Sequence, residues 1–479
     1  MKTWINKGIE SLRHMSVQVK ASMAFMVVNF MQKGIAFLTT PVFTRLLSTE
    51  EYGKITVYSS WLEIIGIFAM FGLTSNVYYN GILDYKKDQD NFTFSMLTLS
   101  NVITLTVMLA VWTVNRYVLH FLDISPVLFF FMFLSFFIEP AFEFWQAGQR
   151  FSYKYRLVCL FMVLVMIGSP VFSLMGIRLC PSMKVEARII GAQLVTALLS
   201  TGCYIGFICH AGGRPKMRYW RYAVKYNLAL IPFFLSNYIL NGSDRLMISW
   251  YCGDDKAGIY GIGHTMASVV NIIWSSVNAT LLPTIYLKCD EDRREELSGI
   301  VVPVITGFAA VCIMIMLLSP EIIRCLAPSS YGEGMYVIPV VVGGTFIMSL
   351  YTVFSNNLLY EKSSRTVGAA GIAAAVLNLV LNMIFIPKSG YLAAGYTTLC
   401  AYILPVVWGS VALKRLTGYF VYDIRQIGTV SVAVIFSSLF VSRLYDHLLL
   451  RLGILLGMLI VLWIRRKWLF GDIAGKIFR

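Results

Sequence analysis

A lysine stands within an apolar segment near the start of the chain. Lys33 belongs to the run Asn29–Tyr52, which begins as an apolar helix, breaks at Pro41 and carries Arg45 just beyond the break. A lysine inside an apolar span is costly, so it faces protein or water rather than lipid. Two interpretations are open. Lys33 pairs with a neighbouring carboxylate and is structural, or Lys33 and Arg45 line a cavity for an anionic substrate.

The next apolar segment carries a carboxylate that could pair with this lysine. With a rise of about 1.5 Å per residue and a hydrocarbon core of about 30 Å, Lys33 and Glu63 come to a similar depth. We predict that the two side chains pair in one state of the protein. Arrival of an anion or a proton would break the pair and so act as a switch.

Polar residues recur at helical spacing in three further apolar segments, and residues three or four apart share one helix face. The stripes are Glu139, Glu143, Gln146 and Arg150; Asn237, Asn241 and Arg245; and His264, Ser268, Asn271, Ser275 and Asn278. A single stripe is explained by hydrogen bonds between helices, at about 1 kcal/mol or less per bond. Several stripes together predict a wet central cavity. His264 is either a proton-coupling group or, more commonly for a lone intramembrane histidine, a hydrogen-bonded packing residue.

The composition places these residues in a membrane protein. Hydrophobic residues make up 57% of the 479 positions and charged residues only 14%, which is typical of a polytopic membrane protein rather than a soluble domain. The net charge of +15 resides mostly in loops, as membrane orientation requires, so we expect no nucleic-acid partner. The nine cysteines show no metal spacing, and we expect no metal, no cofactor and no disulfide framework.

Fourteen segments approach the roughly 20 apolar residues that a membrane-spanning helix needs. They are 17–40, 55–80, 92–114, 126–146, 155–177, 187–209, 223–243, 257–285, 299–318, 334–359, 366–386, 391–413, 427–445 and 447–464. With the N-terminus inside, the cytoplasmic loops carry more than twice as many basic residues as the opposite loops. This asymmetry predicts that both termini are cytoplasmic. We expect an all-α integral membrane protein without a cleaved signal peptide.

The spans fall into two groups of six. We predict an N-terminal six-helix bundle at 1–210, a basic cytoplasmic linker at 211–225 and a C-terminal six-helix bundle at 226–416. Two additional helices and a basic cytoplasmic tail make up 417–479. A faint internal echo supports the duplication, because Thr44-Arg45-Leu46 ends the first span and Asp244-Arg245-Leu246 ends the seventh. Secondary transporters are often duplicated in this way, with the substrate site where the repeats meet.

Four stretches resemble the polysaccharide flippases of the O-antigen (Wzx) type, which belong to the MOP exporter superfamily. The most specific is MQKGIAFLTTPVFTRLLSTEEYGKITVYSSW, at 31–61. The looser ones are AGIYGIGHTMASVV, SNNLLYEKSSRTVG and LNLVLNMIFIPKSGYLAAGYTT. The resemblance implies a two-bundle, alternating-access fold of six spans plus six with two extra spans. It also implies transport of a polyprenyl-diphosphate-linked oligosaccharide across the bacterial inner membrane.

The resemblance implies that Lys33, Arg45 and Arg150 face the cavity, and the other polar groups fit the cargo that it implies without being fixed by the family. The diphosphate needs cations, which Lys33, Arg45, Arg150 and Arg245 would supply. The saccharide needs hydroxyl and amide partners. These would be Asn237, Asn241, Ser268, Asn271 and Ser275. Coupling to H⁺ or Na⁺ would fall to Glu63, Glu139, Glu143 and His264.

Rival functions remain within and beyond this fold. A lipid II or teichoic-type exporter would use the same architecture, and so would a cation-coupled multidrug antiporter, which Glu139 and Glu143 would suit. A membrane polysaccharide polymerase would need a sizeable catalytic loop, and the loops here are short. We therefore expect a transporter rather than an enzyme, with membrane lipid around it and polymerases or glycosyltransferases as partners.

Overall fold

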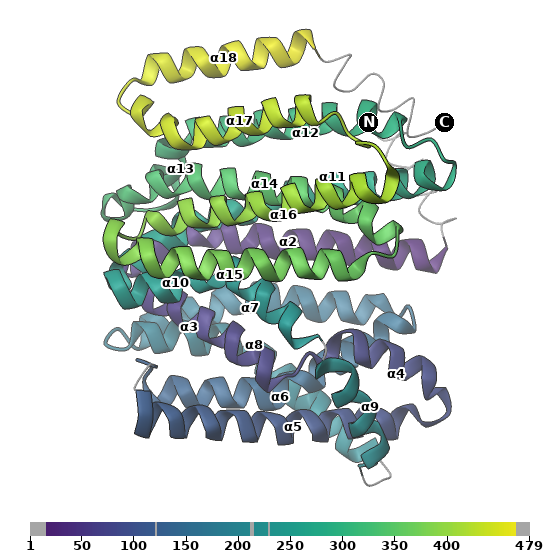
Figure 1. The fold of residues 1–479 in the computed structure, drawn as a ribbon. Helices are drawn as coiled ribbons and strands as arrows, with labels where there is room; N and C mark the ends of the chain where they lie inside the picture. The colour runs from purple at the N-terminus through teal and green to yellow at the C-terminus, as the bar shows by residue number, and fades with distance from the viewer. Residues whose placement is uncertain (1–15, 120–121, 211–214, 229, 466–479) are drawn as a thin grey trace, which may run out of the picture. The chain divides into compact units, whose positions relative to one another are not determined.

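The computed structural model describes residues 16–119, 122–210, 215–228 and 230–465. All regular secondary structure within these ranges is helical (Figure 1). The predicted cytoplasmic tail beyond 465 and residues 211–214 of the predicted linker lie outside the described residues. All nine cysteines are described, and all are free.

The chain divides into two compact units. The first unit comprises Met1–Thr39 and Trp61–Leu235, and the second comprises Thr40–Ser60 and Ser236–Arg479. Helices α2 (Val17–Leu46) and α3 (Thr49–Ala69) therefore each contribute to both units. The predicted six-plus-six division at 211–225 stays a prediction.

The first unit is built around α6 (Pro126–Phe151), which packs against α5, α7 and α8. The other elements in this part of the chain are η1 (Leu73–Val77), α4 (Tyr78–Asp84), η2 (Lys86–Asp88), α5 (Gln89–Val114), η3 (Asn115–Leu119), α7 (Tyr155–Leu179), α8 (Lys184–His210) and α9 (Met217–Leu228). Ser125 caps α6 by accepting a hydrogen bond from the Leu128 amide, and Pro126 occupies the first turn, where a missing N–H costs nothing.

The second unit is built around α14 (Val337–Tyr360), which is almost wholly buried and packs against α11, α12, α16 and α17. Its further elements are α10 (Ile231–Cys252, which begins in the first unit), α11 (Asp254–Asp290), α12 (Glu296–Leu317), α13 (Ser319–Leu326), η4 (Ser329–Tyr336), α15 (Ser364–Ser389), α16 (Ala393–Thr417), α17 (Ile424–Phe440), η5 (Val441–Leu444) and α18 (Leu448–Ile464). Asp423 caps α17 by accepting from two backbone amides, those of Arg425 and Gln426.

Each of the fourteen predicted spans overlaps a helix. Eleven helices in the described part of the chain are long and apolar enough to cross a membrane, or twelve if the bent pair α9 and α10 forms one span. Helix α18 is apolar but shorter, and α3 is a 21-residue helix outside this set. The prediction of an all-α polytopic membrane protein is confirmed.

The predicted break at Pro41 is wrong, because α2 continues through this proline to Leu46. A proline is tolerated in a membrane helix when side chains re-satisfy the backbone around it. Beyond the proline, the Pro41 carbonyl accepts from Arg45 Nη1 at 2.7 Å and from Thr44 Oγ1 at 3.3 Å, and these two side chains brace the last turn of the helix.

The segment Thr40–Ser60 is held in the second unit by hydrogen bonds from side chains to backbone carbonyls. Thr44 Oγ1 donates to Leu326 O at 2.7 Å, and Tyr331 Oη donates to Ser48 O at 2.8 Å. The hydroxyl of Tyr238 donates to Ser60 O at 2.9 Å. The corner between α2 and α3 is thus fixed by the second half of the sequence.

Candidate functional site

Helix α6 brings four predicted polar residues together in the first unit. Glu139, Glu143, Gln146 and Arg150 are all half-buried, on one face of an otherwise apolar helix. Arg150 Nη2 lies 3.4 Å from Gln146 Oε1, and its guanidinium carbon is 5.1 Å from the centre of the Phe25 ring. The Nε of Arg150 is buried without a hydrogen-bond partner. This guanidinium therefore keeps unused donors, the arrangement that a phosphate oxygen can complete.

The two carboxylates of this stripe lie one turn apart. Glu143 lies beside the Thr74 hydroxyl and is attracted electrostatically by Arg150. Glu139 lies beside Ser135, and the charge of Glu143 repels it. Neighbouring carboxylates in such a setting readily hold a proton or a cation between them. The structure thus brings the predicted coupling residues Glu139 and Glu143 together with Arg150.

Lys33 and Glu63 also belong to the first unit, and both are exposed. Neither makes an ion pair with any residue that the structure describes, so the predicted Lys33–Glu63 pair is not formed in this state. Whether Lys33 is structural or faces the substrate therefore stays a prediction.

Arg45 lies in the second unit and is exposed. Its guanidinium donates to two backbone carbonyls, Pro41 O at 2.7 Å and Cys325 O at 3.5 Å. Part of its donor set is therefore already used to hold the end of α2.

Helices α10 and α11 bring Arg245 and His264 together in the second unit. Arg245 Nη2 lies 2.9 Å from His264 Nδ1, and both side chains are half-buried. Because the guanidinium can only donate, Nδ1 accepts and the imidazole is held neutral with its proton on Nε2. The pair ties His264 to a structural contact, which favours the packing role over proton transfer.

Asp244 is a buried carboxylate that is not among the predicted site residues. Its side chain is 4% exposed and accepts hydrogen bonds from Tyr260 Oη at 2.9 Å, Asn382 Nδ2 at 2.8 Å and Thr398 Oγ1 at 2.9 Å. A second layer surrounds it, in which Asn378 Nδ2 donates to Thr398 Oγ1 and Thr397 donates to Asn382.

The elements α10, α11, α15 and α16 therefore converge on one acidic group. A carboxylate buried inside a membrane span is a candidate group for holding a proton or a small cation. Two features of the sequence could have indicated this site: an aspartate inside an apolar span, and Asn378 and Asn382 at a four-residue spacing.

The predicted saccharide ligands are all exposed in the second unit. Asn241 Nδ2 donates to Asn237 Oδ1 at 2.8 Å, and Ser275 donates to the backbone of its own helix. Ser268 and Asn271 have no side-chain hydrogen bond to described residues. The end of the stripe is structural, since Asn278 accepts from Asn356 at 2.8 Å. The middle of the stripe thus offers free hydroxyl and amide groups.

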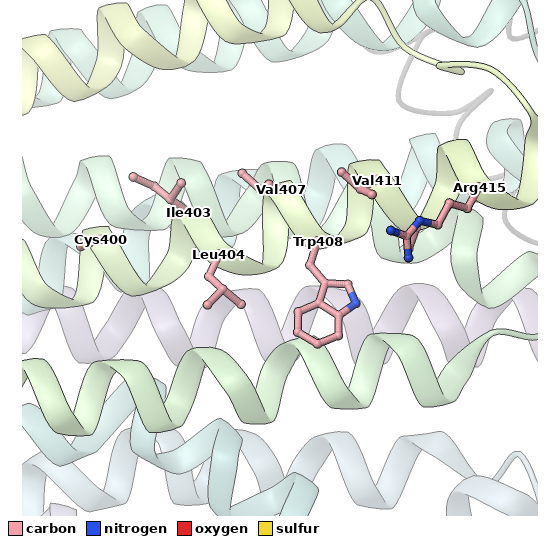
Figure 2. Close-up of a pocket in the computed structure, with 8 residues that line it drawn as sticks. Cys400, Ile403, Leu404, Val407, Trp408, Val411 and Arg415 are labelled. Carbon is pink, nitrogen blue, oxygen red and sulfur yellow. The ribbon is translucent and has the colours of Figure 1, made fainter.

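A groove of about 570 Å³ lies along α16. Figure 2 shows Ile403 and Val407 on one flank, Leu404 and Trp408 on the other, and the guanidinium of Arg415 at the end of the row. An open apolar groove that ends in a cation suits an amphiphile with an apolar chain and an anionic group.

A family model described as polysaccharide biosynthesis protein matches residues 19–286, which is more than half of the chain. The chain belongs to this family. It is 20% identical over 454 residues to the probable low-salt glycan biosynthesis flippase Agl15 of Haloferax volcanii, a match that covers 92% of this chain and 94% of that relative.

Two solved structures show the same fold. The lipid II flippase MurJ, in an inward closed conformation, is similar with a TM-score of 0.69 and 14% identity, over 95% of this chain and all of that one. An inward-facing multidrug MATE transporter of the MOP superfamily is similar with a TM-score of 0.59 and 14% identity, over 84% and 98%. The resemblance to the polysaccharide flippase family is confirmed by the family model and by the relative Agl15, and the two solved structures show the fold. The protein is a multi-pass membrane protein of the polysaccharide biosynthesis family.

Proposed function

We propose that this protein moves a polyprenyl-diphosphate-linked oligosaccharide, such as a repeat unit of O-antigen, capsule or exopolysaccharide, across the bacterial inner membrane by alternating access. The observation that carries the proposal is that two cations of the first unit, Lys33 and Arg150, each make no ion pair with any described residue. Cations kept free in a transporter of this family suit a cargo with a diphosphate.

Other groups fit the remaining parts of such a cargo. Ser268 and Asn271 offer hydrogen bonds to sugar hydroxyls. The α16 groove offers an apolar surface for the prenyl chain, with Arg415 at its end. Arg45 and Arg245 would contribute secondary contacts, because both already use donors within the protein. Asp244, Glu139 and Glu143 would carry the coupling H⁺ or Na⁺, and both termini would lie in the cytoplasm.

The test is accumulation of lipid-linked saccharide on the cytoplasmic leaflet in a deletion strain. We expect wild type to restore export and Lys33→Ala and Arg150→Ala to fail at equal expression. Lys362→Ala is the matched control, since Lys362 is an exposed lysine without a described ion pair. Full restoration by Lys33→Ala and Arg150→Ala would reject the assignment of the diphosphate to these cations.

A multidrug antiporter is the second candidate, favoured by the adjacent half-buried carboxylates Glu139 and Glu143. Cationic substrates would require these groups ionised, so Glu139→Gln with Glu143→Gln would abolish efflux of a cationic dye. If wild type exports no such dye but restores saccharide export, the antiporter is excluded. Replacing the saccharide carrier with lipid II in reconstituted vesicles separates the third rival, a lipid II exporter.

A further inference from the structure

Helix α9 is polar and basic, and side-chain hydrogen bonds hold it against the first unit. Tyr219, Ala223 and Asn227 are fully buried, and they recur every four residues on one face. Trp220 Nε1 donates to Ser95 O at 2.9 Å, and Tyr222 Oη donates to Asp84 at 2.9 Å. These contacts fix which face of the helix turns away from the protein.

Electrostatic contacts hold the start of the helix. Asp88 of η2 accepts from both Lys216 Nζ and Tyr219 Oη. Asn80 Nδ2 donates to Tyr226 Oη at 3.1 Å, near the other end. The inner face of α9 is therefore bonded along its whole length, and the outer face is presented in a fixed orientation.

The outer face has an apolar half. With successive residues about 100° apart, Met217, Val224 and Leu228 fall within an arc of about 40°. They are 60%, 38% and 61% exposed. Three large apolar side chains fixed outward in one row would be costly in water.

The other half of the outer face is basic. Arg221, Lys225 and Arg218 follow the apolar row over the next arc of about 60°. All three are exposed. Arg218 stacks on Tyr219 and Tyr85, whereas Arg221 and Lys225 make no ion pair within the described part of the chain.

An apolar row flanked by free basic side chains is the pattern of a helix that lies in the membrane interface. Three basic residues in twelve positions make α9 too costly for the hydrocarbon core itself. We propose that the outer face of α9 lies in the headgroup layer of the leaflet predicted to be cytoplasmic and binds anionic phospholipid. Met217, Val224 and Leu228 enter the acyl boundary, and Arg221 and Lys225 pair with headgroup phosphates.

The first test measures lipid retained by the full-length protein after exchange into mixed phosphatidylglycerol and phosphatidylcholine. Each basic residue near an anionic surface favours binding roughly fivefold, so we expect Arg221→Gln with Lys225→Gln to retain several-fold less phosphatidylglycerol. The matched control, Lys362→Gln with Arg365→Gln, removes two charges from other exposed positions and should retain as much as wild type. Equal retention by both variants, or an equal loss, would overturn the proposal.

The second test uses tryptic cleavage after Arg221 and Lys225 in nanodiscs. Phosphatidylglycerol nanodiscs should protect these sites several-fold relative to phosphatidylcholine nanodiscs, and 0.5 M salt should remove the protection, because screening shortens the reach of surface charge to a few ångströms. Substituting Met217, Val224 and Leu228 with serine should also remove it. Equal cleavage in both lipids would refute lipid binding. So would a double variant, Arg221→Gln with Lys225→Gln, that loses saccharide export but retains as much phosphatidylglycerol as wild type, because the basic side chains would then serve another role.

Discussion

Gly53 and Gly258 lie backbone to backbone where α3 crosses α11 in the second unit. A Cβ on Gly258 would fall 2.2 Å from Thr49 O and 2.9 Å from Gly53 N, and one on Gly53 would fall 1.7 Å from Asp254 O. Small residues let helix backbones approach this closely in membranes. The two glycines are the points at which the Thr40–Ser60 segment docks on the second half of the chain.

Gly53→Ala should therefore destabilise the protein, although alanine is the better helix former by about 1 kcal/mol. The clash is with backbone atoms, which cannot rotate away, and overpacking of this kind costs about 1–3 kcal/mol or more. We expect a fall in the thermal unfolding midpoint in detergent of several degrees. Gly202→Ala is the matched control because nothing lies within 4 Å of its Cβ position. A Gly53→Ala midpoint equal to that of Gly202→Ala would mean that the crossing can open at no cost.

Two substitutions of Asp244 separate the effect of its charge from the effect of its hydrogen bonds. In Asp244→Asn the amide oxygen can still accept from Asn382, while the amide nitrogen can donate to the hydroxyls of Tyr260 and Thr398, which can turn to accept. In Asp244→Ala three buried donors lose their acceptor, at about 1–3 kcal/mol each. We expect the unfolding midpoint to be near wild type for the asparagine variant and clearly lower for the alanine variant.

The same pair tests ion coupling. If Asp244 carries the coupling ion, Asp244→Asn should fold and yet fail to restore saccharide export. Asp446 is exposed and forms no hydrogen bond with described residues, so Asp446→Asn and Asp446→Ala serve as controls that should behave like wild type. Full export by Asp244→Asn would show that the acidic group only holds four helices together.

The sequence was sufficient to locate the helices, because apolar stretches of membrane length leave few alternatives to a helix. It also placed Glu143 and Arg150 correctly on one face, since the 3.6-residue period decides this locally. The sequence pattern did not show that α2 continues through Pro41, because a proline both breaks helices and is tolerated inside membrane helices.

The contacts between distant segments could not be predicted. The hydrogen-bond partners of Asp244 are Tyr260, Asn382 and Thr398, which lie up to 154 residues away in the sequence. The echo between the first and seventh spans indicated that Arg45 and Arg245 are related, but Arg45 binds backbone and Arg245 binds His264. Spacing alone cannot distinguish an arginine that is free from one that is engaged.

Arg150 and Arg451 differ in one respect: Arg451 makes a salt bridge with Glu321, whereas Arg150 makes none with the described residues. Arg451 is 3% exposed, donates twice to Glu321 at 2.8 Å and donates to Leu317 O at 2.8 Å. Removing one partner of a buried pair is costly, whereas Arg150 is half-buried and has no carboxylate within ion-pair distance among the described residues. We expect Arg451→Met to lower the unfolding midpoint by several degrees and Arg150→Met to leave it unchanged or raise it. Saccharide export should fall in Arg150→Met despite its stability, and a lower midpoint in Arg150→Met would make Arg150 a structural residue.

The Glu321–Arg451 pair, between α13 and α18, also predicts a pH dependence. Hydrogen bonds from Arg451 lower the pKa of Glu321 below its ordinary value of 4.5. A carboxyl whose pKa is lower in the folded state contributes stability that is complete above about pH 4.5 and is lost as the pH falls through the folded-state pKa. Because Glu321 is 38% exposed, solvent screens part of this contribution. The thermal unfolding midpoint should therefore fall further between pH 6 and pH 3.5 for wild type than for Glu321→Gln.

The control for this titration is Glu50→Gln, which removes an exposed carboxylate paired with Lys54 at 2.7 Å. Surface pairs contribute little to stability, so Glu50→Gln should follow the wild-type curve over the same range. Two further curves decide the cause. Arg451→Met should start lower and show the shallow slope of Glu321→Gln, because neither variant retains the charge pair. If Arg451→Met keeps the steep wild-type slope, the acid sensitivity arises from other carboxylates and the α13–α18 contact is not the group that titrates.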